Sequence, residues 1–145
     1  VANGVLLALG CALGGWSLHV LDGHLRYVHN LYGKERHVVA DDRPLTPGPH
    51  RLEFVFEKDD GHGGHAALRC DGAPTADGTI PRFTPAGFNG VGIGLTCGYE
   101  WGPAVGEGYT APFPFNGTIR RAEVLATGPV TRDPVVELAA ILAEQ

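Results

Sequence analysis

Two runs of alternating apolar and polar residues, 14–21 and 24–30, flank the pair Asp22-Gly23. An Asp-Gly pair between two such runs is typical of a β-hairpin, because a type I′ turn requires positive φ at both central residues. A turn at this pair fixes the cross-strand partners Leu21 with His24, Val20 with Leu25, His19 with Arg26, Leu18 with Tyr27, and Trp16 with His29. The pattern therefore predicts two long antiparallel strands in a known register.

The two faces of this hairpin differ in polarity, since successive side chains of a strand point to opposite faces. The first face is apolar and is predicted to lie in the core; it carries Trp16, Leu18, Val20, Leu25, Tyr27 and His29. The second face is mixed and is predicted to lie near water or a ligand; it carries Ser17, His19, Leu21, His24, Arg26 and Val28.

Short apolar or alternating runs continue along the chain, with turn residues between them. They predict further strands at 4–10, 35–40, 50–58, 65–70, 73–80, 90–96 and 116–125. In 50–58, Leu52, Phe54 and Phe56 share one face, and in 116–125 we expect Ile119 and Val124 in the core. Many short strands at close spacing indicate an all-β fold, an antiparallel β-sandwich or jelly roll.

The tail has a different pattern. Asp133 suits an N-cap and Pro134 the first helical position, and an apolar stripe follows at Val135, Leu138, Ile141 and Leu142. We expect a β-sandwich domain over 1–126, then a linker and a short C-terminal amphipathic α-helix over 127–145. The stripe could cover the sandwich itself, a partner chain or a neighbouring domain.

Composition narrows the possible functions. The 145 residues fit one domain, and the net charge of −5 without a basic stripe argues against a nucleic-acid partner. No apolar stretch is long enough to span a membrane. The odd number of cysteines, Cys11, Cys70 and Cys97, favours small buried side chains in a reducing, cytoplasmic compartment. A chain that begins at Val1 and has no methionine is expected to be a piece of a longer or processed protein.

Several motifs, taken in order, resemble the C-terminal domain of large bacterial arylsulfatases. They are Gly4–Gly10, Gly14–Leu18, Asp22-Gly23, Tyr27–Asn30, Gly48–Phe54, Gly61–Gly64, Asp71-Gly72 and Pro112–Ile119, which together span roughly Gly4 to Leu125. The resemblance implies a concanavalin- or laminin-G-like sandwich appended to a sulfatase catalytic domain of the same polypeptide.

The resemblance does not imply sulfatase activity for this chain. Such sulfatases mature a Cys or Ser within a C-x-P-x-R motif, and none of the three cysteines has that context. No catalytic residue is carried over, so we expect a non-catalytic accessory domain with no cofactor. The chain departs from its relatives in the tail helix and at 96–101, where relatives often carry an Asp.

Two groups of residues are candidates for ligand binding. His19 and Arg26, with Ser17 beside them, could line a groove for a sulfated or carboxylated sugar, or could form a solvated face or contact a missing domain. Tyr99 and Trp101 lie in a glycine-rich loop, where they could stack on a glycan, or Trp101 could fold back onto the core. An independent carbohydrate-binding module is therefore the alternative function.

Metal binding and catalysis have weaker support. Glu100 and Glu107, with loop carbonyls, are weak candidates for calcium ligands. His62 and His65 flank two glycines, a pattern that favours a solvated turn over a metal pair. Ser17 is the only serine and no Gly-x-Ser-x-Gly elbow exists, so a stand-alone lectin-like enzyme ranks last.

Overall fold

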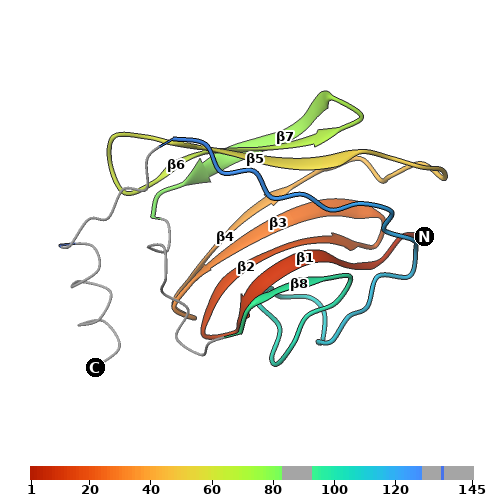
Figure 1. The fold of residues 1–145 in the computed structure, drawn as a ribbon, viewed down its shortest axis with the longest axis horizontal. Helices are drawn as coiled ribbons and strands as arrows, with labels where there is room; N and C mark the ends of the chain where they lie inside the picture. Colours follow the sequence, from red (N-terminus) through yellow and green to blue (C-terminus); the bar gives the residue numbers. More distant parts are fainter. Residues whose placement is uncertain (83–92, 129–134, 136–145) are drawn as a thin grey trace.

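The computed structural model describes residues 1–82, 93–128 and 135, and this part of the chain forms two antiparallel sheets (Figure 1). The five-stranded sheet has the order β4-β3-β2-β1-β8 and the three-stranded sheet the order β5-β6-β7. The strands are β1 (Gly4–Cys11), β2 (Gly14–Leu21), β3 (His24–Leu31), β4 (Glu35–Ala40), β5 (Leu52–Lys58), β6 (Gly64–Cys70), β7 (Ala73–Ile80) and β8 (Leu95–Cys97). The all-β, sandwich-like architecture is as predicted. No described helix is long and apolar enough to cross a membrane.

The predicted hairpin is confirmed pair by pair. Strands β2 and β3 join Trp16 to His29, Leu18 to Tyr27, His19 to Arg26, Val20 to Leu25, and Leu21 to His24. Its turn residues Asp22 and Gly23 have φ of 51° and 85°, the positive values that a type I′ turn requires. The turn at Asp71-Gly72 has the same form and joins β6 to β7.

The core lies between the two sheets. Its buried side chains come from both layers: Leu18, Val20, Leu25, Tyr27, Val39, Ala66, Leu68 and Ile80. Leu52, Phe54 and Phe56 of β5 pack against this cluster, as their alternation predicted. The rings of Tyr27 and Phe54 stack across the interface with centroids 3.5 Å apart. The apolar face of the hairpin is therefore the face that joins the sheets.

A short segment closes the fold by joining distant parts of the chain. We call residues 112–116 the closing segment. Val5 N–H donates to the Phe113 carbonyl at 3.0 Å, and Asn116 N–H donates to the Asn3 carbonyl at 2.9 Å. Phe115 N–H donates to the Gly98 carbonyl at 2.9 Å, and the Phe115 ring packs against the core. The N-terminus, β8 and the closing segment thus form one bonded unit.

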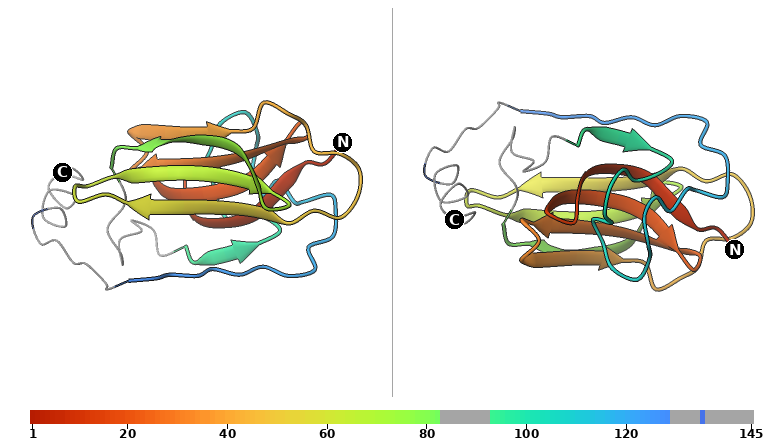
Figure 2. Two further views of the ribbon diagram at one scale, coloured as in Figure 1. Left: turned by 90° about the horizontal axis from the view of Figure 1, so that it is seen from above. Right: turned by 90° about the horizontal axis from the view of Figure 1, so that it is seen from below.

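Two predictions for the second half of the chain need correction. The strand at 116–125 is absent: these residues run along the side of the molecule where β5 and β8 lie (Figures 1 and 2) and pair with neither. Val124 is 61% exposed and Ile119 only half-buried, so neither is a core residue. Strand β8 begins at Leu95; residues 90–92 of its predicted range, and the predicted helix apart from Val135, lie outside the described residues.

Candidate functional site

A loop lies across the outer face of the five-stranded sheet (Figure 2, right). We call residues 98–111 the covering loop. The Tyr109 ring of this loop packs on His19, and Glu107 pairs with Arg36. The mixed face of the hairpin was predicted to lie near water or a ligand, but Ser17, His19 and Val28 are buried. The covering loop shields them, and only part of this face stays open.

Buried polar groups fix the covering loop in place. Glu100 is 1% exposed, and its Oε2 accepts a hydrogen bond from Val105 N–H at 3.1 Å. Its Oε1 accepts from the Tyr109 hydroxyl at 2.6 Å. From β3, Asn30 Nδ2 donates to the carbonyls of Ala12 and Val105 at 3.1 and 3.0 Å. The Glu100 bonds fix the shape of the loop, and the bond from Asn30 to Val105 holds the loop against the sheet.

The two calcium candidates of this loop have different surroundings. Glu100 is enclosed by Val105 and Tyr109, whereas Glu107 is exposed and pairs with Arg36 at 3.3 Å. Among the described residues, the grouping of three or more potential metal ligands lies elsewhere, at His50, Cys70 and Asp71. The structure therefore gives Glu100 a structural role in the loop and Glu107 a place in an ion pair.

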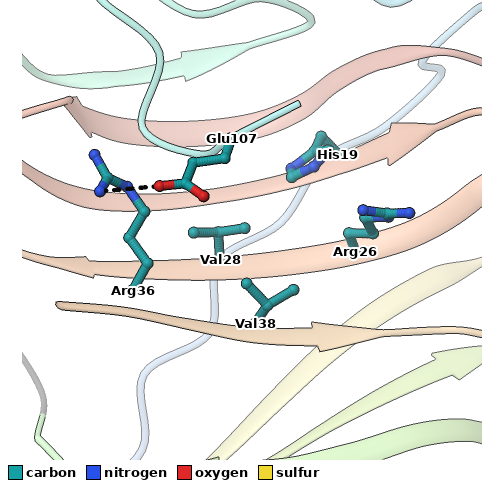
Figure 3. A pocket seen from close by; sticks show the side chains of 6 residues that line it. All are labelled: His19, Arg26, Val28, Arg36, Val38 and Glu107. Atoms are coloured by element: carbon teal, nitrogen blue, oxygen red, sulfur yellow. Dashed lines mark ion pairs between the residues drawn. The ribbon is translucent and has the colours of Figure 1, made fainter. Parts of the chain in front are cut away.

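A pocket of about 180 Å³ opens beside the covering loop (Figure 3). It is lined by His19, Arg26, Val28, Arg36, Val38 and Glu107. The residues come from β2, β3, β4 and the loop, so the pocket spans three strands of the sheet. His19 and Arg26 lie at one end and the Arg36–Glu107 pair at the other, with the two valines between them (Figure 3). Polar groups therefore flank an apolar middle.

His19 is neutral at pH 7. Burial, with a smaller contribution from the Arg26 charge, lowers the pKa of His19 to about 4. Its Nδ1 lies 3.3 Å from the Ser17 hydroxyl, and the backbone of Ser17 also bonds to the ring. The buried Nε2 has no hydrogen-bond partner among the described residues. It therefore offers one buried polar atom to a bound molecule.

Arg26 adds a second buried polar atom, an N–H donor, at the same end of the pocket. Its Nε is buried and also lacks a hydrogen-bond partner among the described residues. Arg36 differs, because its Nε donates to the Val105 carbonyl at 3.3 Å and its charge is paired with Glu107. Among the described residues Arg26 takes part in no ion pair, so this end of the pocket holds a cation beside two buried nitrogens without described partners, an arrangement that suits an anionic acceptor.

Only some of the predicted binding residues come together. Ser17, His19 and Arg26 form one group, as expected from the hairpin register. Tyr99 and Trp101 do not line the pocket; they lie on the covering loop, where Trp101 is 66% exposed. The Trp101 side chain is therefore not a lid on the core.

Arg36 and Val38 were missed by sequence reasoning. Strand β4 pairs with β3 so that Arg36 faces Asn30 and Val38 faces Val28. Extending the alternation from the first hairpin into β4 would have placed both residues on the face of Arg26 and Val28.

Comparisons of the chain with protein-family models, curated proteins and solved structures gave no match.

Proposed function

We propose that this chain is a non-catalytic accessory domain of a sulfatase-like hydrolase, with a concanavalin- or laminin-G-like jelly-roll fold. The proposal starts from the resemblance to arylsulfatase C-terminal domains. One observation supports it most: the matched segments 4–10 and 112–119 pack against each other although they are distant in sequence. A Cβ added at Gly4 would overlap the Phe115 backbone, so these two motif residues depend on each other.

Exposed aliphatic side chains support contact with a larger body. Val124 and Leu125 are 61% and 85% exposed, and Leu95 of the edge strand β8 is about half exposed. Strand β8 and residues 117–128 lie on the same side of the molecule (Figure 2). A contiguous exposed apolar patch is typical of an interface. This side is our candidate for packing against the catalytic domain.

Mass spectrometry of an extract from cells that make this protein tests the proposal. We expect a polypeptide several times larger than 15.3 kDa, with an upstream peptide that contains C-x-P-x-R. A natural species near 15.3 kDa would overturn the accessory-domain proposal.

The packing side can be tested in that longer polypeptide. We expect Leu125→Asp to loosen the contact, so that limited proteolysis releases this domain several-fold faster. Leu13→Asp is the matched control, because Leu13 is an exposed leucine in the turn between β1 and β2. Equal release rates for both variants would argue against this side as the interface.

A second function, binding of a sulfated or carboxylated sugar, is favoured by the pocket. Arg26 Nε–H can donate to an anionic group, and the buried His19 Nε2 lies at the same end of the pocket, where it can bond to the same molecule. Val28 and Val38 provide an apolar surface for the carbon face of a sugar ring. Such binding is compatible with the accessory role.

Calorimetric titration with glucuronate, a sulfated monosaccharide and glucose tests this function. We expect the two anions to bind and glucose to bind at least about tenfold more weakly. Arg26→Gln is expected to abolish the difference, while the exposed Arg51→Gln control preserves it. Equal binding of all three sugars would contradict an anion site. A loss of affinity in Trp101→Ala would extend the binding surface onto the covering loop.

A further inference from the structure

Three side chains with metal-ligand chemistry meet at one end of the three-stranded sheet, away from the pocket. They are His50, which precedes β5, Cys70 at the end of β6, and Asp71 in the following turn. His50 Nδ1 lies 2.8 Å from Asp71 Oδ2, and Cys70 Sγ lies 3.7 Å from each of these two atoms. The sequence predicted only a packing role for Cys70, and Asp71 was noted only as part of the motif Asp71-Gly72.

The backbone orients two of these side chains. His50 Nε2 is 2.7 Å from the Thr46 carbonyl oxygen, and because a carbonyl only accepts, Nε2 carries a proton. Nδ1 is thereby directed at Cys70 and Asp71. A histidine that donates its second ring N–H to a backbone carbonyl is the usual arrangement of a metal ligand.

Asp71 is held in a similar way. Its Oδ1 accepts a hydrogen bond from Arg51 N–H at 2.8 Å, which leaves Oδ2 on the side of His50 and Cys70. The donor atoms His50 Nδ1, Cys70 Sγ and Asp71 Oδ2 therefore converge from the loop before β5, the end of β6 and the turn after it.

The distances between the donor atoms fit a tetrahedral zinc ion. Zinc bonds of about 2.0–2.3 Å place neighbouring ligand atoms about 3.3–3.6 Å apart. Both sulfur distances of 3.7 Å are close to this, and the 2.8 Å between Nδ1 and Oδ2 must open by about 0.5 Å. A thiolate, an imidazole and a carboxylate are the ligand types that zinc takes.

We propose that His50 Nδ1, Cys70 Sγ and Asp71 Oδ2 bind one Zn²⁺ ion, with water as the fourth ligand. Binding displaces the thiol proton of Cys70 and any proton on His50 Nδ1, and both leave to solvent. The site links the loop before β5 to the β6–β7 turn, so zinc also stabilises this end of the sheet. The proposal is independent of the accessory and sugar-binding functions.

Titration of the full chain with Co²⁺, followed by displacement with Zn²⁺, tests the site. We expect one Co²⁺ per chain, with tetrahedral absorption and a thiolate-to-cobalt charge-transfer band that Zn²⁺ removes. Cys70→Ser is expected to abolish the band and to weaken zinc binding at least about tenfold. Cys97→Ser is the matched control, since Cys97 is exposed and lies outside the cluster.

A second readout separates loss of a ligand from loss of the fold. Circular dichroism of Cys70→Ser should match that of the original chain. In the original chain, Zn²⁺ should shift the ¹⁵N resonance of His50 Nδ1 strongly and that of His62 not at all. A charge-transfer band that persists in Cys70→Ser, or absence of zinc binding by the original chain, would overturn the proposal.

Discussion

At the scale of single residues, Glu100 shows how a buried carboxylate can hold a loop. Both of its oxygens accept hydrogen bonds, from Val105 N–H and from the Tyr109 hydroxyl. Glutamine keeps the size of the side chain, but its amide nitrogen cannot accept, so Glu100→Gln removes the carboxylate oxygen that one of these two donors bonds to and with it a charge-assisted hydrogen bond. We expect a loss of about 2 kcal/mol in unfolding free energy and faster hydrogen exchange at the Val105 amide.

Glu107→Gln is the matched control for this prediction. Glu107 is exposed and makes a surface ion pair with Arg36, and such pairs contribute at most about 1 kcal/mol. The loss should therefore be small, and the Val105 amide should remain protected. A larger loss for Glu107→Gln than for Glu100→Gln would contradict the anchoring role.

Two buried histidines make stability depend on pH. Burial lowers the pKa of both His19 and His29 to about 4, with the Arg26 charge adding to the effect on His19 and the His37 charge to that on His29. Between about pH 6.5 and 4 the unfolded chain therefore binds more protons than the folded chain. Unfolding free energy should fall as pH falls through this window, by up to about 3 kcal/mol for each histidine.

Urea unfolding at pH 7, 5.5 and 4.5 measures this dependence. His19→Gln should make the stability less dependent on pH, because it removes one of the two titrating groups. His62→Gln should leave the dependence unchanged, since His62 is exposed in the turn between β5 and β6. A stability that is constant from pH 7 to 4.5 would show that these histidines are not buried as neutral groups.

At the scale of elements, the sequence was sufficient to predict strand pairing wherever a turn fixed the register. Asp22-Gly23 determines every pair of the β2–β3 hairpin, and hence the pairing of His19 with Arg26. The turn between β3 and β4 contains Tyr32 and Gly33, which both have positive φ. The sequence has no Asp-Gly or Asn-Gly pair at this turn that would predict such values. Arg36 was missed for this reason.

In residues 116–125, the alternation of apolar and polar residues alone was not sufficient to predict a strand correctly. It indicates which side chains could share a face, but a strand also requires a partner edge. Among the described residues, neither β5 nor β8 pairs with this segment. Val124 therefore remains exposed despite a pattern that suits a strand.

The β1–β2 hairpin depends on close approach of its two backbones. Gly15 has φ of 138°, and a Cβ added there would overlap the Leu9 carbonyl oxygen. We expect Gly15→Ala to lower the unfolding free energy by at least about 3 kcal/mol, because strand separation and backbone strain add. Urea unfolding measures the loss.

Gly72→Ala is the control for Gly15→Ala. Gly72 also has positive φ, 83°, but nothing lies within 4 Å of an added Cβ. Only the conformational cost remains, about 1–2 kcal/mol. Equal losses in the two variants would mean that the strands adjust to the added methyl group.

At the scale of the whole molecule, the candidate pocket combines a local pair with distant residues. His19 and Arg26 are neighbours across one hairpin, whereas Glu107 is brought to Arg36 by the covering loop. The loop's position depends on Glu100, Asn30 and Tyr109, contacts that no short sequence pattern encodes. This is why the pairing of His19 with Arg26 could be predicted from the sequence, whereas the burial of the hairpin face that carries them could not.

The closing segment should make the two ends of the described chain unfold together. Phe115 packs against the core, and its backbone is bonded to Gly98. We therefore expect Phe115→Ala to lower the unfolding free energy by about 2 kcal/mol and to shift the amide resonances of Val5 and Gly98. Leu125→Ala, at an 85% exposed position, should change the unfolding free energy by less than about 0.5 kcal/mol. Similar losses in both variants would show that the segment beyond residue 116 contributes to the fold as much as the closing segment does.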